Sequence, residues 1–303
     1  MAIKRNVLIA YVCLAGICLI WGTTFLVMKM GVHSFPPFLF AALRQVNAGI
    51  LLTGYLILVK GLSWPDRKHM LKLALGGFLM ITMGNGLVSW AVVYIPSSVA
   101  AIICSAMPVC IVLLNLTINR SEFPNATIIF GVLAGMVGIL MVFSEHLADF
   151  SEPKYSMGIA LVFVATISWA GASFLMKKSN ETISPFLNAG IQMFFGGLFC
   201  LPFSALFDDY TSLAWSATTF YSLGYLIIVG STMAYAMYSY ALTQLPLTIA
   251  SLYSYINPLV AVVLGWLVLS EKLNTKIAVA ILITLVGIYM VNRGYQQLLR
   301  KRL

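Results

Sequence analysis

The amino-acid sequence predicts an all-α polytopic membrane protein with ten transmembrane helices in two inverted five-helix repeats. Three observations lead to this fold class. First, 61% of the 303 residues are hydrophobic, and the mean hydropathy is +0.96. Second, only 27 side chains are charged, 18 Lys or Arg plus 9 Asp or Glu, whereas a soluble protein of this length carries about 75 at the usual ~25%. Third, the two halves of the chain resemble each other. A water-soluble surface cannot be built from this composition.

The formal net charge of +9 is spread over small clusters between long apolar runs and forms no basic patch. This pattern excludes nucleic acid as a partner, and the composition excludes disorder and fibrous repeats. The cysteines all lie inside apolar runs without metal-ligand spacing, so we interpret them as small hydrophobes and expect neither a metal nor a cofactor. They are Cys13, Cys18, Cys104, Cys110 and Cys200.

A helix needs about 20 apolar residues to cross the ~30 Å hydrocarbon core, and ten such runs are separated by charged residues, Pro or polar turns. The first run begins after Lys4-Arg5 and is too long for a signal sequence, so we expect it to be retained. Only the tight turn Tyr94-Ile95-Pro96 divides the third run from the fourth. The first repeat, 7–144, contains the predicted spans 7–28, 37–59, 71–94, 97–118 and 124–144.

The second half follows the same order of apolar runs and breaks. Its eighth and ninth spans are divided only by Gln244-Leu245-Pro246, the counterpart of the turn at Pro96. The second repeat, 157–294, contains the predicted spans 157–177, 185–206, 218–243, 246–269 and 275–294.

An internal repeat connects the two halves at a nearly constant offset. The segment Trp21–Lys29 (WGTTFLVMK) aligns with Trp169–Lys177 (WAGASFLMK) at 148 residues. Repeats of five spans must be inverted, because an odd number of crossings reverses the orientation; many secondary transporters are built this way. Further matched positions, at 148 to 150 residues, are Arg44 with Gln192, Gly49 with Gly197, Pro96 with Pro246, Pro108 with Pro258, Ser121-Glu122 with Ser270-Glu271, Gly138 with Gly287, and Met141-Val142 with Met290-Val291.

The basic residues predict the orientation. With the N-terminus in the cytoplasm, the inside segments hold 13 Lys or Arg and the outside segments hold four. This bias predicts that both termini are cytoplasmic, in a multi-pass protein of the cytoplasmic (inner) membrane. The outside residues are Lys29, Lys154, Lys272 and Lys276, and the inside residues are Lys4, Arg5, Lys60, Arg67, Lys68, Lys72, Arg120, Lys177, Lys178, Arg293, Arg300, Lys301 and Arg302.

These motifs resemble the EamA family of the drug/metabolite transporter superfamily over about residues 10–293. The resemblance rests on the Trp-Gly-Thr-Thr-Phe turn from Trp21, the Leu43-Arg44 pair, the Ser-Glu ends of the fourth and ninth spans, and the stretch LPLTIASLYSYINPLVAVVLGWLVLSEKLN from Leu245 to Asn274. It implies ten helices in two inverted repeats and carrier-type movement of small metabolites, often outward. It does not specify the substrate, because similar proteins handle amino acids, sugars, nucleobases and other compounds.

The sequence contains no machinery for catalysis or for ATP use. No GxxxxGK[ST] pattern is present to bind ATP phosphates, so transport must use a gradient or exchange. His33, His69 and His146 lie at predicted loop edges without a carboxylate in a neighbouring apolar run. An enzyme would need a nucleophile, a base and an orienting group together. We therefore expect a protein that is not an enzyme.

All nine acidic residues lie in loops or at span ends. An intramembrane carboxylate is the usual proton relay and the usual partner of cationic drugs. The resemblance implies the same, because the small four-helix antiporters related to this family rely on a carboxylate in the first helix. Its absence argues against a multidrug-cation antiporter. Glu145 and Glu271 are interpreted as interfacial solvated charges, with titration as the alternative.

Arg44 is the only charged residue well inside a predicted span, about 10 Å deep at 1.5 Å per residue past Pro37. An intramembrane ionisable group is a functional hypothesis by default. The structural alternative is that the guanidinium extends to the outer interface or binds helix-end carbonyls at a repeat junction. The resemblance favours the structural role slightly, because family members with differing substrates share an Arg here.

Polar and aromatic side chains inside spans form the other candidate group, because a buried polar group in lipid must find a partner or line a wet cavity. Pro108 and Pro258 are expected to kink their helices, with ligand contact as the weaker alternative. Gly131-x-x-x-Gly135 presents a small face for the tenth span or for a second protomer in a homodimer. The candidate substrate-binding residues are Arg44, Trp21, Thr23, Thr24, Asn85, Trp169, Gln192, Tyr235, Tyr253 and Asn257.

The leading function is a secondary carrier that exports amino acids or related small metabolites across the lipid bilayer by alternating access. The runner-up is a sugar or nucleotide-sugar type exchanger, and a third alternative is a membrane scaffold without transport. Arg44 predicts a preference for carboxylate-bearing or zwitterionic solutes. A cation held by the ring faces of Trp169, Tyr235 and Tyr253 ranks second, because it would lack a counter-charge.

Overall fold

The computed structural model describes residues 2–117, 124–143, 152–178, 184–269 and 275–302, and every regular element within these ranges is helical. The all-α prediction is therefore confirmed. Six helices in the described part of the chain are long and apolar enough to cross a membrane. They are Arg5–Ser34, Pro37–Val59, Arg67–Tyr94, Pro153–Lys177, Pro185–Phe207 and Ala217–Gln244.

These six helices are the first three predicted spans of each half. In the first half they contain α1 (Ala2–Gly31), η1 (Val32–Ser34), α2 (Pro37–Gly54), η2 (Tyr55–Val59), α3 (Arg67–Gly77), η3 (Phe78–Gly86) and α4 (Leu87–Tyr94). In the second half they contain α8 (Pro153–Lys178), α9 (Pro185–Phe207), α10 (Ala217–Tyr225), η7 (Leu226–Met233) and α11 (Ala234–Gln244), with the short η6 (Tyr210–Ser212) in the loop before α10.

The predicted fourth and ninth spans are each divided into two helices. The fourth comprises α5 (Ser97–Cys104) and α6 (Met107–Thr117), and the ninth comprises α12 (Leu247–Ala250) and α13 (Tyr253–Leu269). The predicted fifth and tenth spans form α7 (Ala126–Phe143) and α14 (Thr275–Arg302).

The two breaks differ in their relation to the proline. Pro108 stands in the first turn of α6, where its missing N–H removes no helical hydrogen bond, so the fourth span breaks next to it. The ninth span breaks at Ser251, and Pro258 lies inside α13. The break in the ninth span therefore precedes Pro258 and does not coincide with it. Tight i→i+3 bonds, including the one from Leu252 N to Ile249 O at 3.1 Å, interrupt the α-helix earlier.

Two π-helical segments occupy matched positions in the two halves. The segment η3 begins at Phe78 and η7 begins at Leu226, which is 148 residues later and equals the offset of the Trp-containing motif. A π-helical turn widens the helix and is frequent at functional sites. The sequence periodicity gives no sign of either segment.

The helices of the two halves interdigitate. The helices α2 and α9 cross closely at glycines 148 residues apart: a Cβ on Gly49 would lie 2.5 Å from the backbone nitrogen of Phe194, and one on Gly197 would lie 2.7 Å from that of Val46. Phe194 and Val46 are themselves 148 residues apart. The crossing is therefore nearly symmetric about an axis between the repeats.

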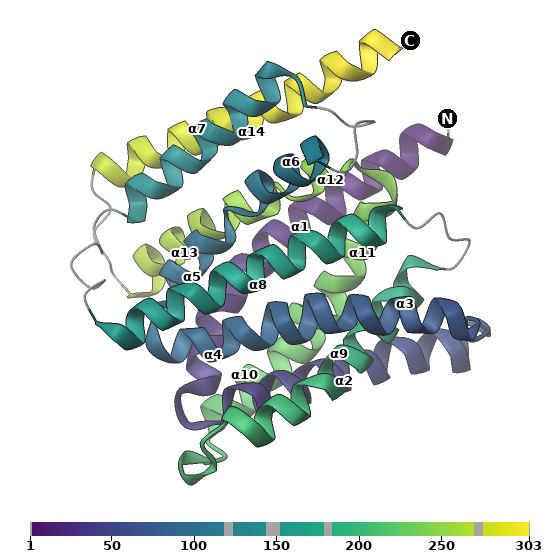
Figure 1. Cartoon of the computed structure of the whole chain (residues 1–303), viewed down its shortest axis with the longest axis vertical. Coiled ribbons are helices and arrows are strands. Elements are labelled where there is room, and N and C mark those ends of the chain that lie inside the picture. The colour runs from purple at the N-terminus through teal and green to yellow at the C-terminus, as the bar shows by residue number, and fades with distance from the viewer. Residues whose placement is uncertain (1, 118–123, 144–151, 179–183, 270–274, 303) are drawn as a thin grey trace.

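The helices α7 and α14 form a second close pair, which lies along one edge of the bundle (Figure 1). A Cβ on Gly131 would lie 2.8 Å from the carbonyl oxygen of Gly287, and a Cβ on Gly287 would lie 2.5 Å from the backbone nitrogen of Gly135. The small face of α7 therefore packs on α14 of the same chain. These glycines are not available to a second protomer.

Lys29, near the end of α1, binds the C-terminal end of α4. Its Nζ donates hydrogen bonds to the carbonyl oxygens of Val92 at 3.1 Å and Ile95 at 2.8 Å. A cation at a helix C-terminus satisfies carbonyls that lack a helical partner and interacts favourably with the helix dipole.

Lys177 makes the equivalent contact in the second half. Its Nζ donates to the carbonyl oxygens of Leu242 at 2.6 Å and Leu245 at 2.8 Å, at the end of α11. The lysines are 148 residues apart and their acceptors 150, so the same interaction connects equivalent helices in both repeats.

Both chain termini lie at one end of the helix bundle, and the loop around η6 lies at the opposite end (Figure 1). We refer to the latter as the far end. Asp208 in that loop accepts hydrogen bonds from the backbone nitrogens of Phe38 at 3.1 Å and Leu39 at 2.8 Å, and so caps the first turn of α2. This cap fixes the start of the helix that carries Arg44.

Candidate functional site

The helices line a partly open cavity with about 90 Å³ of space for the centres of water molecules. In α1 its lining runs from Trp21 to Met28, and in the oppositely directed α8 it runs from Ala165 to Trp169. The space therefore extends from the two tryptophans toward the far end. It is lined by Trp21, Thr24, Phe25, Met28, Arg44, Gln45, Gly84, Asn85, Val88, Cys104, Met107, Ala165, Thr166, Trp169, Gly230, Ser231, Tyr235, Tyr253, Ser254 and Asn257.

The cavity brings together eight of the ten residues that the sequence predicts as candidate substrate ligands. These are Trp21, Thr24, Arg44, Asn85, Trp169, Tyr235, Tyr253 and Asn257. They come from both repeats, as expected of a site at the repeat interface.

Thr23 and Gln192 do not line the cavity. Thr23 donates to the carbonyl of Ile20 at 2.7 Å and shares a hydrogen bond with the Tyr225 hydroxyl at 2.6 Å. Gln192 lies behind Tyr235, and its Oε1 accepts a hydrogen bond of 2.7 Å from the Tyr235 hydroxyl. Gln192 therefore positions a cavity residue without facing the space itself.

Arg44 is 4% exposed and is held across the repeat interface. Its Nε donates to Ser231 Oγ at 2.7 Å, and its Nη2 donates to the carbonyl oxygen of Gly230 at 3.1 Å. Both acceptors belong to the π-helical segment η7. The guanidinium therefore does not extend to the outer membrane interface. It binds a helix of the other repeat, as the structural role at a repeat junction predicts.

The guanidinium retains binding capacity after these two contacts. Its Nη1 makes no hydrogen bond to any residue that the structure describes, and no described carboxylate lies within salt-bridge distance of Arg44. A buried guanidinium without a counter-ion favours an anionic or dipolar occupant. Arg44 can thus connect the repeats and bind a ligand at once.

Two side-chain amides in the cavity lack partners. Gln45 is 2% exposed, and its Oε1 is buried without a hydrogen bond. Asn85, in η3, also makes no hydrogen bond to the described residues. Three cavity residues, Gln45, Gly230 and Ser231, were not predicted from the sequence. The only available signal was a run of small and polar residues in the eighth span, Gly230-Ser231-Thr232.

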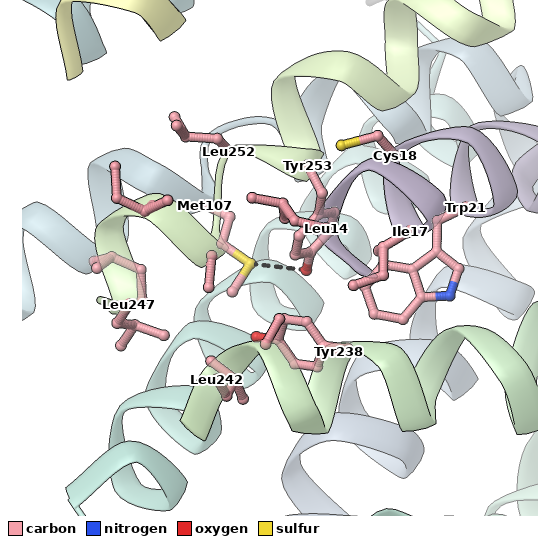
Figure 2. Packing of buried hydrophobic residues seen from close by; sticks show 14 of the residues in the cluster. Leu14, Ile17, Cys18, Trp21, Met107, Tyr238, Leu242, Leu247, Leu252 and Tyr253 are labelled. Carbon is pink, nitrogen blue, oxygen red and sulfur yellow. Dashed lines mark hydrogen bonds between the residues drawn. The ribbon is translucent and has the colours of Figure 1, made fainter. Parts of the chain in front are cut away.

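The side of the cavity nearest the termini is closed by aromatic rings. The rings of the repeat-equivalent Trp21 and Trp169 meet edge to face at 5.6 Å between centroids, and Trp21 also contacts Tyr253 at 4.8 Å. Tyr238 packs beneath them, 5.5 Å from Tyr253. Figure 2 shows Trp21, Tyr238 and Tyr253 among aliphatic side chains from several helices. This aromatic cluster separates the cavity from the end that holds the termini.

The tyrosine hydroxyls in this cluster have partners. Tyr253 OH donates to Met107 Sδ at 3.2 Å (Figure 2), and Tyr238 OH shares a hydrogen bond of 2.7 Å with Ser173. The amide nitrogen of Asn257 is oriented to donate to the carbonyl oxygens of Tyr253 at 2.9 Å and Cys18 at 3.2 Å. The unpartnered polar atoms therefore lie on the wall formed by α2 and η3, not in the aromatic cluster.

No catalytic or metal-binding constellation appears among the described residues. They contain no group of three or more His, Cys, Asp or Glu side chains that could hold a metal ion. The cavity lining includes neither His nor a carboxylate. Glu145 and Glu271 lie outside the described residues.

Comparisons with known proteins agree with the fold. The EamA-like transporter family model matches residues 8–144 and again 156–293. The chain is 31% identical to the uncharacterized inner membrane transporter YedA of Escherichia coli (strain K12), over 86% of this chain and 83% of YedA. It is 24% identical to the uncharacterized transporter YoaV of Bacillus subtilis (strain 168), over 91% of this chain and 94% of YoaV.

Two further proteins are similar. Protein PecM of Dickeya dadantii (strain 3937) is 30% identical, over 84% of this chain and 82% of PecM. A solved crystal structure aligns with a TM-score of 0.78 over 97% of this chain and 99% of that chain, at 17% sequence identity. This structural match shows a shared fold alone.

The family model matches nearly the whole chain, once in each half, and the relatives above align over most of their own length. Together with six apolar helices of membrane-spanning length, these matches identify an integral multi-pass membrane protein of a transporter family. Transporters of this kind are generally not enzymes. The chain belongs to the EamA-like transporter family.

Proposed function

We propose that the protein is a secondary carrier that exports amino acids or related small carboxylates across the cytoplasmic membrane by alternating access. The observation that carries the proposal is Arg44: a buried cation that lines a cavity at the repeat interface without an acidic partner among the described residues. The substrate carboxylate would bind at Arg44 Nη1 and supply the missing counter-charge.

The proposed architecture has ten transmembrane helices, with α5–α6 and α12–α13 as interrupted fourth and ninth spans. Support for two equivalent repeats comes from contacts that recur at offsets of 148 to 150 residues. These are the Lys29 and Lys177 caps, the Gly49 and Gly197 crossing, and the η3 and η7 segments. Five spans in each repeat would invert one relative to the other.

Alternating access is supported by the position of the cavity. The cavity extends from the Trp21–Trp169 pair toward the far end, and the aromatic cluster fills the equivalent space toward the termini. In a protein built of inverted repeats, exchanging the conformations of the halves would exchange the open and filled sides. The 13 to 4 basic bias would place the termini in the cytoplasm, so the cavity would face the outside.

A labelled-solute panel tests this function. Everted inner-membrane vesicles reverse the sidedness of the membrane, so an exporter accumulates its substrate inside them. We expect vesicles with the protein to take up one or more neutral or anionic amino acids above empty-vector vesicles, in a manner abolished by collapse of ion gradients or dependent on a counter-substrate. A flat result across amino acids, sugars and nucleobases would support the scaffold alternative.

A sugar or nucleotide-sugar type exchanger is the second candidate. The free amides of Gln45 and Asn85 could bind hydroxyl groups, and the faces of Trp21 and Trp169 could pack on a sugar ring. The same panel separates the two candidates. Sugar counter-transport without amino-acid transport would replace the leading proposal.

A further inference from the structure

The side chain of Gln45 is the strongest binding feature that the carboxylate site leaves unused. Gln45 follows Arg44 directly in α2 and lines the same cavity. It is 2% exposed, and its Oε1 is buried without a hydrogen-bond partner. Its amide nitrogen makes no hydrogen bond to the described residues either. A complete amide, with one acceptor and two donors, is therefore available.

Gln192 provides a direct comparison within the same chain. It is also buried, at 5% exposure, but both ends of its amide are engaged. Its Oε1 accepts from Tyr235 OH at 2.7 Å, and its Nε2 contacts Met176 Sδ at 2.9 Å. A glutamine that serves packing in this bundle is thus satisfied by protein groups. Leaving such an amide unsatisfied in a buried site costs free energy, so the Gln45 amide favours a cavity occupant that supplies its hydrogen-bond partner.

The size of the cavity limits where that partner lies. The space open to the centres of water-sized groups, 90 Å³, equals that of a sphere about 6 Å across. Because Gln45 follows Arg44 directly in α2 and lines the same small space, a ligand whose carboxylate binds Arg44 reaches Gln45 most directly with a group that lies a few bonds from that carboxylate. The natural position is the carbon next to the carboxylate, where amino and hydroxy acids carry a hydrogen-bond donor.

We infer that Gln45 accepts a hydrogen bond from the ammonium or hydroxyl group on the carbon adjacent to the substrate carboxylate. Gln45 would then be a specificity-determining residue that separates 2-amino and 2-hydroxy acids from simple carboxylates. The amide oxygen is a neutral acceptor. It can therefore accept a hydrogen bond from either a charged ammonium group or an uncharged hydroxyl group. This inference rests on the proposed function, since it assumes a carboxylate at Arg44.

The test is calorimetric titration of the full-length protein in detergent with three five-carbon probes, L-norvaline, L-2-hydroxypentanoate and pentanoate. We expect the wild type to bind the first two about tenfold more tightly than pentanoate, which is typical of a site whose buried acceptor is left unpaired by the poorer ligand. Gln45→Met keeps the side-chain volume and removes the amide. This variant should bind L-norvaline and L-2-hydroxypentanoate about as weakly as pentanoate, so the affinity ratio falls to near one. Its affinity for pentanoate should stay at the wild-type value.

Gln192→Met is the matched control and should keep the wild-type ratio, because that amide faces Tyr235 and not the cavity. If Gln45→Met does not fold, Gln45→Leu serves in its place. A wild type that binds all three probes within about twofold of each other, or a Gln45→Met variant that weakens all three equally, overturns the inference but leaves the carboxylate site standing. If the wild type binds none of the probes, the carboxylate site and this inference fail together.

Discussion

Arg44 and Trp21 donate hydrogen bonds to the same carbonyl oxygen, that of Gly230, and both donor–acceptor distances are 3.1 Å. Arg44 lies on α2, Trp21 on α1 and Gly230 on the π-helical η7, so one acceptor connects three helices and both repeats. A carbonyl that accepts from a guanidinium and an indole is fully used. The conformation of η7 and the position of the cavity cation therefore depend on each other.

The shared carbonyl predicts unequal effects for the two cavity tryptophans. Trp21→Phe keeps a ring but removes the donor to Gly230, and it should lower the free energy of unfolding by about 1 kcal/mol. Trp169→Phe should cost less, because its indole bond to Tyr238 OH is long, at 3.4 Å, and that hydroxyl already pairs with Ser173. Apparent unfolding temperatures of the two variants in one detergent provide the comparison. Equal shifts would contradict it.

The α2–α9 crossing predicts a position-specific glycine effect. Gly49→Ala should destabilise the protein, because the new Cβ would lie 2.5 Å from the backbone of Phe194, which cannot rotate away. Gly54 lies on the same helix with nothing within 4 Å of an added Cβ. Gly54→Ala should be neutral or stabilising by up to about 1 kcal/mol through helix propensity. Thermal unfolding of both variants is the test, and a Gly49→Ala protein as stable as Gly54→Ala would refute the close crossing.

The equivalent contacts of Lys29 and Lys177 predict that removing either lysine lowers the stability of the protein by a similar amount. Lys29→Met and Lys177→Met each remove a cation that holds two helix-end carbonyls, and each should lower the free energy of unfolding by about 1 to 3 kcal/mol. Lys60→Met is the control, since Lys60 is exposed and its Nζ lies over the Tyr55 ring at 5.8 Å from the centroid, the far limit of a cation–π contact. It should change stability by less than about 0.5 kcal/mol. A control variant that is destabilised as much as the others would argue against specific capping.

The basic bias predicts the membrane topology. Reporter fusions after both termini and in the loops near residues 66 and 180 should report a cytoplasmic location, and fusions near 149 and 209 should report an outside location. A C-terminus located outside would show that the proposed ten spans are miscounted, because an even number of crossings returns the chain to its starting side.

Residue patterns predicted the parts of this structure that follow from composition and periodicity. The long apolar runs marked the six clear spans, and the Trp-Gly-Thr-Thr-Phe motif located Trp21 and Trp169, which meet in the folded protein. Arg44 was recognisable because a lone charge in an apolar run has few explanations.

Features that depend on tertiary packing were not predictable. Gln45 neighbours Arg44, but adjacent helical residues point about 100° apart, so nothing in the sequence places both in one cavity. The break at Ser251 depends on i→i+3 bonds that no residue type encodes, and the widening at η7 is invisible to hydropathy. Thr23 does not line the cavity, and its hydroxyl hydrogen-bonds with that of Tyr225, which is 202 residues away in the chain.

Transport in everted vesicles tests most directly whether Arg44 is the carboxylate-binding cation of a carrier. The vesicles carry wild type, Arg44→Lys or Arg44→Ala, and immunoblots first confirm that all three proteins insert equally. We expect wild type to transport a neutral or anionic amino acid and not a quaternary ammonium dye. Loss of a charged hydrogen-bond partner predicts a decrease of about 10- to 100-fold in Arg44→Ala and a smaller one in Arg44→Lys. An Arg44→Ala protein that inserts normally and transports the amino acid unchanged, or a wild type that moves only the dye, would contradict the claim and assign Arg44 to the scaffold alone.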